Sequence, residues 1–173
     1  MSRAKTTSLF IAVFLCSVTV ALAKLPSWDT VKPPQARFKV LPAFAGEAVV
    51  DRETGLVWEL TWNGSATFRA ALRQCALSTV GGRAGWRLPA VEELTSLVDP
   101  TQTAPALPPG HPFASVSISN DYWTANEEEL DTSMAVTVSF NVFGVDSASK
   151  TSSRPFVCVR GGRGSTVGTR GGI

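Results

Sequence analysis

Few side chains in this sequence could carry out chemistry, and their arrangement argues against catalysis. The 173-residue chain has three cysteines, Cys16, Cys75 and Cys158, and its one histidine is His111. No two cysteines have the Cys-x-x-Cys spacing typical of zinc sites, and one histidine cannot complete a ligand set. No nucleophile or carboxylate stands next to His111, and no Gly-x-Ser-x-Gly motif occurs. We therefore predict a protein without catalytic residues, metal or cofactor.

Charged residues form two runs in the second half of the chain. The segment 120–131 has asparagine and carboxylate oxygens but no Lys or Arg, so it could hold Ca²⁺, which takes six to eight oxygens. A solvated acidic loop is the alternative, and we favour it because most charge runs face solvent. The C-terminal end is basic, with Lys150, Arg154, Arg160, Arg163 and Arg170.

The first 23 residues have the pattern of an export signal. Arg3 and Lys5 precede an apolar run over 9–22, and Ala21-Leu22-Ala23 has the small-x-small pattern that precedes cleavage. The run is shorter than the roughly 20 apolar residues that span a bilayer. We therefore favour cleavage before Lys24 over an uncleaved anchor, which would leave a periplasmic or secreted protein without a membrane span.

Cleavage would leave two cysteines in an exported chain, and this count predicts a disulfide between Cys75 and Cys158. Closing a loop of about 84 residues stabilises a protein by roughly 4 to 5 kcal/mol in the chain-entropy model. The remaining chain of about 150 residues is long enough for one domain with a core. Without Arg3 and Lys5 the 16 basic residues become 14, equal to the 14 acidic ones, so a nucleic-acid partner is not expected.

The order of the predicted elements indicates an α+β domain rather than alternating strands and helices. A strand hairpin is predicted over 48–60, with Gly55 supplying the positive φ of its turn. Residues 63–65 are expected to end the second strand and to cap a helix over 66–78, which is buried along the face of Cys75. The other predicted segments are an extended lead-in over 24–43, a helix over 90–98, an irregular proline-rich segment over 101–112, strands near 121–124, 135–140, 142–145 and 156–159, and a glycine-rich tail over 162–173.

A set of motifs occurs in order along the chain. They are Thr54-Gly55-Leu56 with Trp58, then Cys75, Gly82, Trp86-Arg87-Leu88-Pro89, Glu92-Glu93-Leu94, Tyr122-Trp123 and Cys158-Val159-Arg160. Together they resemble the Lcl C-terminal domain family, and the WRLP-x-x-EEL part is the most specific. The resemblance covers about 44–161, which we take as the domain.

The resemblance implies a C-type-lectin-like fold and a surface or periplasmic role in a bacterium. Some members bind sulfated glycans, so we expect a non-enzymatic binding module with a glycan or surface ligand. Lys150, Arg154 and Arg160 are then the candidate contacts. Among the tryptophans, Trp62 is the one that we most expect to be exposed and so able to stack on a sugar. A structural or protein-binding module without glycan binding remains the alternative.

The chain departs from related proteins in several places. It lacks the Glu-Pro-Asn, Gln-Pro-Asp and Trp-Asn-Asp triplets of calcium-dependent lectins. The related formylglycine-generating enzymes need a reactive cysteine pair to hold copper, which a structural disulfide would remove. The family often has Thr or Ser after WRLP as a helix cap, and Ala90 here would cost about 1 kcal/mol. Arg87 is expected to pair with a carboxylate from Glu92, Glu93 or Asp51.

Overall fold

The computed structural model describes residues 33–162. The predicted signal peptide over 1–23 and the tail from 163 onward lie outside the described residues. Short helices accompany three antiparallel sheets, so the predicted α+β class is confirmed. In this part of the chain no helix has the length and apolar character needed to cross a membrane.

A four-stranded antiparallel sheet contains the predicted hairpin. Its strand order is β1-β2-β3-β9, and Val49 lies opposite Trp58 in the hairpin. Gly55 in the turn has a φ of 75°, which side chains disfavour, as the sequence predicted. The strands are β1 (Phe38–Val40), β2 (Ala48–Asp51), β3 (Val57–Glu59) and β9 (Val159–Arg160).

The segment before β2 differs from the extended lead-in predicted over 24–43. Arg37 forms an ion pair with the buried Asp51 at 2.8 Å, and the Phe38 ring packs edge-on against Phe113 with 5.2 Å between centroids. Both partners lie in other parts of the chain, so the local sequence pattern did not indicate these contacts. The elements here are α1 (Pro34–Arg37), the edge strand β1 and the 3-10 helix η1 (Pro42–Phe44).

A two-stranded sheet, β4-β8, corrects a second prediction. Residues 63–65 do not cap a helix, because Gly64 begins β4 and the cap position of the next helix is Thr67. A Cβ on Gly64 would come within 2.6 Å of the Phe156 ring, so the glycine lets this ring lie against the opposite strand. The strands are β4 (Gly64–Ala66) and β8 (Arg154–Phe156).

Two helices accompany the sheets. The longer one, α2, is buried along the face of Cys75 as predicted, with Phe68 and Ala71 on the same face, whereas the neighbouring Ala76 is exposed. The second helix, α3, begins after Pro89 as predicted but ends sooner than residue 98. The bounds are α2 (Phe68–Leu77), the 3-10 helix η2 (Val80–Gly82) and α3 (Val91–Thr95).

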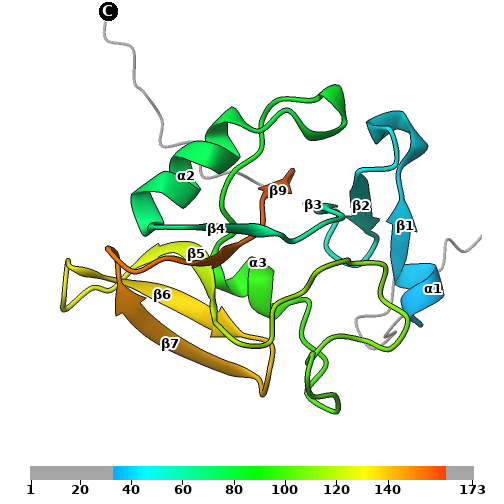
Figure 1. The fold of residues 1–173 in the computed structure, drawn as a ribbon. Coiled ribbons are helices and arrows are strands. Elements are labelled where there is room, and N and C mark those ends of the chain that lie inside the picture. The colour runs from blue at the N-terminus through cyan, green and yellow to red at the C-terminus, as the bar shows by residue number, and fades with distance from the viewer. Residues whose placement is uncertain (1–32, 163–173) are drawn as a thin grey trace, which may run out of the picture. The chain divides into compact units, whose positions relative to one another are not determined.

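The remaining sheet, β5-β6-β7, is a three-stranded meander that confirms the strands predicted near 121–124 and 135–140. The segment predicted over 142–145 lies partly in the turn, and the third strand begins at Gly144 and continues to Ser149. Val138 lies opposite both Tyr122 and Val145, and the register of β5 shifts between Trp123 and Glu127. Figure 1 shows this sheet at the lower left, with β4 and β8 between it and α2. The strands are β5 (Tyr122–Glu127), β6 (Met134–Ser139) and β7 (Gly144–Ser149).

The buried side chains form two clusters. The first lies between the four-stranded sheet, α3 and the irregular segment before β5, and it contains Trp58. The second lies around α2 and contains Trp86, Trp123 and both cysteines of the predicted disulfide. The motif tryptophans of the sequence therefore serve the core.

Candidate functional site

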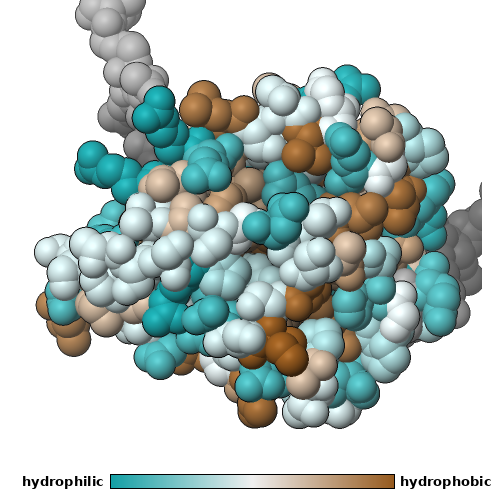
Figure 2. All heavy atoms as spheres, viewed as in Figure 1, coloured by the Kyte–Doolittle hydropathy of each residue, from teal (hydrophilic) through white to brown (hydrophobic). Residues whose placement is uncertain are grey.

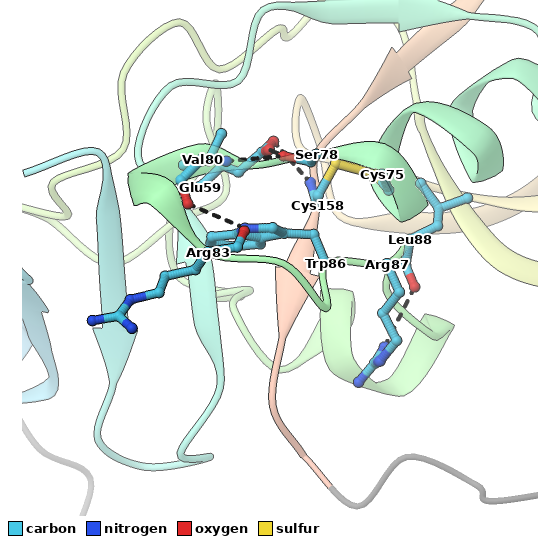
Figure 3. The surroundings of a disulfide bond; sticks show 9 residues. All are labelled: Glu59, Cys75, Ser78, Val80, Arg83, Trp86, Arg87, Leu88 and Cys158. Carbon is cyan, nitrogen blue, oxygen red and sulfur yellow. Dashed lines mark hydrogen bonds between the residues drawn. A yellow bond between two sulfur atoms is a disulfide. The ribbon is translucent and has the colours of Figure 1, made fainter. Parts of the chain in front are cut away.

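The predicted disulfide joins Cys75 on α2 to Cys158 between β8 and β9 (Figure 3). The S–S distance is 2.12 Å and the two Cα atoms are 5.3 Å apart. Both residues are buried in the cluster around α2. The bond therefore fastens the longest helix to the closing strand of the domain.

Arg87 has a structural role, and its partner is one of the three carboxylates predicted for it. Nη1 and Nη2 donate to the two carboxylate oxygens of Glu93, each at 2.6 Å. Nη2 also donates to the Gly161 carbonyl oxygen, and the backbone of Arg87 pairs with that of Val159. Burial raises the pKa of the Glu93 carboxyl, but the hydrogen bonds from Arg87 and from the Ala90 backbone outweigh it and leave the pKa below its ordinary value. The WRLP-x-x-EEL motif thus fixes α3 to β9.

Strand β5 supplies the side-chain cap that Ala90 cannot provide for α3. Ala90 has no acceptor, but its N–H donates to Glu93 Oε2 at 2.9 Å. The next N–H, that of Val91, donates to Asn126 Oδ1 on β5, also at 2.9 Å. The expected cost of Ala90 is therefore offset by an asparagine far along the chain.

Replacing Asn126 with alanine should accordingly lower the free energy of unfolding by about 1 kcal/mol, the usual value of a helix cap. Chemical denaturation measures the loss. The Ala90→Ser change in the same background should restore part of it, since a serine oxygen can then accept at the helix start. An unchanged stability in Asn126→Ala would show that water caps α3 equally well.

Trp62 is not exposed, so this part of the predicted ligand site is wrong. Its side chain is 2 % exposed, and its Nε1–H donates to the Glu59 carbonyl oxygen. Three rings surround it at centroid distances of 4.8 to 5.5 Å, those of Phe113, Tyr122 and Phe140. Phe113 directly follows the irregular proline-rich segment over 101–112, and the sequence pattern did not indicate that the chain passes over the core there.

The oxygens of the acidic run do not converge on one point. Glu127 accepts from Lys150 Nζ at 2.6 Å, and Asn126 is occupied with the start of α3. Asp131 accepts from the backbone and the hydroxyl of Ser133, and these hydrogen bonds lower the pKa of its carboxyl. Among residues 33–162 no three His, Cys, Asp or Glu side chains are grouped as metal ligands are.

Two of the predicted basic contacts are already paired. Lys150 forms an ion pair with Glu127, and Arg154 Nη1 lies 3.7 Å from Asp121 Oδ2. Lys150 also lines an open groove of about 600 Å³ at the start of α2, which we call the Lys150 groove. Its lining includes Thr67, Arg69, Leu72, Glu127, Lys150 and Thr151.

Arg160, the third predicted contact, forms a pair with an arginine that the sequence analysis missed. The guanidinium carbon of Arg160 lies 5.8 Å from the centroid of the Phe44 ring, and that of Arg83 lies 5.7 Å from the same centroid. The distance between the two guanidinium carbons therefore cannot exceed the sum of these two distances. Neither is in an ion pair with a described carboxylate. We call Arg83 and Arg160 the arginine pair.

The local backbone explains how this arginine pair arises. Trp86 is buried and donates from Nε1 to the Arg83 carbonyl oxygen at 2.8 Å, which holds the loop after η2. Arg83 and Arg87 point in different directions from this loop (Figure 3). A Cβ on Gly85 would lie 3.5 Å from Arg160 Nε, so the loop passes close to that side chain. The arrangement of Arg83 and Arg160 around one ring depends on η1, which carries Phe44 and which the sequence did not predict.

Comparison with known proteins supports the resemblance of the motifs. No curated protein sequence matches the chain. Residues 47–160 match the model of the Lcl C-terminal domain, which is more than half of the chain and includes the disulfide, the WRLP motif and Arg160. The chain therefore belongs to the Lcl C-terminal domain family.

Proposed function

We propose that the protein is a non-enzymatic binding module of the bacterial cell envelope that recognises a sulfated glycan. The observation that carries this proposal is the arginine pair, in which two unpaired guanidinium groups lie over one aromatic ring. The two guanidinium carbons lie 5.7 and 5.8 Å from the same ring centroid, so one anionic ligand that covers this ring could be attracted by both cations. A sulfate supplies the charge and several oxygens that the planar guanidinium fork can contact.

The Lys150 groove supports the same ligand class at a second place. Arg69 and Lys150 line it, with threonine hydroxyls that can bond to sugar oxygens. Glu127 reduces the charge there, so we expect the groove to contribute less than the arginine pair. The face drawn in Figure 2 is mostly hydrophilic, with hydrophobic residues in small separate groups. A surface of this kind suits a polar ligand.

We also propose that the domain has a C-type-lectin-like fold and works after export, with the signal peptide removed after Ala23. The α+β class, the antiparallel sheets and the family membership support the fold. The disulfide supports the compartment, because such bonds persist in oxidising environments such as the periplasm and the cell exterior.

The variant Arg83→Gln/Arg160→Gln tests the proposal. Charge-assisted hydrogen bonds contribute roughly 1.5 to 3 kcal/mol each, and less where solvent screens them. We therefore expect the double variant to bind a heparin oligosaccharide about tenfold more weakly in calorimetric titration. Binding by the wild type should also weaken as salt is raised, since exposed charges are screened.

The matched control is Lys39→Gln/Arg73→Gln, which removes the same charge from two exposed positions on β1 and α2. We expect this control to bind almost as tightly as the wild type. An equal loss in both double variants would reduce the effect to net charge and contradict a specific site. Equal affinity for a desulfated oligosaccharide would contradict the role of sulfate.

A protein partner is the second candidate, and exposed apolar side chains favour it. Val142, Phe143 and Val145, around the turn between β6 and β7, are exposed by 66 %, 44 % and 51 %. Grouped apolar residues on a surface often mark a protein contact. Absence of binding to every sulfated glycan would leave this structural or protein-binding function ahead.

A further inference from the structure

Glu59 is a half-buried carboxylate whose contacts are all neutral. It is the last residue of β3, and Oε1 accepts from Ser78 Oγ at 3.0 Å while Oε2 accepts from the Cys158 N–H at 3.1 Å. Figure 3 shows it beside the disulfide, with Ser78 and Cys158 as neighbours. Within residues 33–162 no Lys, Arg or His forms an ion pair with it.

Burial disfavours the charged form of this carboxylate, so a cation bound beside it would be stabilising. Desolvation raises the pKa of the Glu59 carboxyl, and the hydrogen bonds from Cys158 and Ser78 only partly counter it. An ionised carboxylate offers about four lone-pair sites, and the two neutral donors occupy two of them. Lone-pair sites for further donors therefore remain on the side of the carboxylate that faces the neighbouring hollows, which we call its open side.

Two hollows meet at Glu59, and we call them together the Glu59 cleft. Glu59 and Asn63 line both hollows, whose volumes are about 390 Å³ and 270 Å³. No Lys, Arg or His lines either of them, whereas Glu47 adds a second carboxylate. The side chains of Asn63, Gln74 and Thr61 make no hydrogen bond to any described residue, so their polar atoms are free for a ligand. The cleft thus combines negative charge with free amides and a hydroxyl.

We propose that the Glu59 cleft binds the protonated amine of an amino sugar that has no N-acetyl group. An ammonium group brings a positive charge and three N–H donors, which complement the open side of Glu59. The amides of Asn63 and Gln74 match the hydroxyl groups around a sugar ring. Leu77, whose side chain is 67 % exposed, offers an apolar contact at the edge of the cleft. None of these residues belongs to the arginine pair.

Other cations fit this chemistry less well. A lysine side chain carries the same ammonium on an alkyl stem that has no hydroxyl groups, so the stem itself cannot pair with the free amides beside Glu59. A hard metal ion takes six to eight oxygens, and no group of three acidic or metal-ligating side chains occurs in the described part of the chain. The combination of one half-buried carboxylate with several neutral polar groups favours a sugar amine.

The test is a calorimetric titration of the whole mature chain with three probes. The first is a fully deacetylated chitosan trisaccharide, the second is its N-acetylated counterpart, and the third is the amide of Nα-acetyl-lysine. We expect the deacetylated sugar to bind at least tenfold more tightly than either of the others, because only it has both the ammonium and the ring hydroxyls.

Glu59→Gln should reduce binding of the deacetylated sugar about tenfold or more. The glutamine carbonyl can still accept from the Cys158 N–H, and its NH₂ can donate to the rotatable Ser78 hydroxyl, so the fold is retained. Glu47→Gln, at an exposed position, should show a smaller loss, and Glu92→Gln on the exposed side of α3 should show none.

Equal binding of the N-acetylated sugar would overturn the proposal, and so would unchanged binding by Glu59→Gln. Tighter binding of the lysine amide would replace the sugar with a peptide ligand, and absence of binding by any amine would also refute it. The arginine-pair variant should bind the deacetylated sugar normally. Failure of the sulfated-glycan proposal therefore leaves this one testable, and the reverse also holds.

Discussion

Alanine at both Cys75 and Cys158 is expected to lower the free energy of unfolding by about 4 kcal/mol. The bond joins residues separated by 83 positions, and a loop of this length constrains the unfolded chain by roughly 4 to 5 kcal/mol. Both side chains are buried, so losing the sulfurs also leaves unfilled space in the core. The free energy of unfolding of a domain is commonly about 5 to 15 kcal/mol, so the disulfide would account for a large part of it. Denaturant unfolding of the two proteins measures the difference.

Reductant supplies the control for this change. The wild type should approach the stability of the double variant once its disulfide is reduced, whereas the double variant should not respond to reductant. A loss of less than about 1 kcal/mol would show that the unfolded chain is already compact without the bond.

The elements that the sequence predicted well are those defined by local spacing. Gly55 marks a turn between two short apolar strands, and it occupies that turn with a positive φ. The helical spacing around Cys75 predicted α2, and Pro89 predicted the start of α3. In each case the signal lies within a few residues of the feature, because turns and amphipathic faces are local properties.

The predictions that failed depend on distant partners. Trp62 follows a strand and stands beside Asn63-Gly64, so we expected it to be exposed, but rings from three other segments cover it. Asn126 was grouped with the acidic run, although it caps α3. Arg83 gave no signal, because its place beside Arg160 depends on the Phe44 ring. Such contacts follow from tertiary packing, which one sequence without relatives does not reveal.

The ion pair of Arg37 and Asp51 also joins residues from different elements of the chain. It indicates that the folded domain begins before residue 44. Asp51 is fully buried, and its two oxygens accept from Arg37 Nε at 3.0 Å and Nη2 at 2.8 Å. The sequence had offered Asp51 as a partner for Arg87. Arg37 lies outside both the domain predicted over 44–161 and the matched span 47–160. A domain that starts at residue 44 would therefore keep the buried carboxylate and lose its cation.

Removing this cation should destabilise the protein strongly. The change Arg37→Met keeps an unbranched side chain but leaves Asp51 as an unpaired buried charge, which costs roughly 3 to 5 kcal/mol. Asp51 would keep only its neutral donors, the Glu53 N–H and the Thr54 hydroxyl. We expect the free energy of unfolding to fall by this amount, and a chain that starts at residue 44 to lose at least as much because it also lacks β1.

A double variant separates the ion pair from the packing around it. Asn at position 51 carries no charge, its Oδ1 can still accept from the Glu53 N–H, and its NH₂ can donate to the rotatable Thr54 hydroxyl. We therefore expect Arg37→Met/Asp51→Asn to be more stable than Arg37→Met alone. Arg73→Met, at an exposed position on α2, should change stability by less than about 0.5 kcal/mol. If the double variant were no more stable than Arg37→Met, the loss would come from the other contacts of the guanidinium, with the Phe38 ring and the Ser96 carbonyl oxygen, rather than from the uncompensated charge.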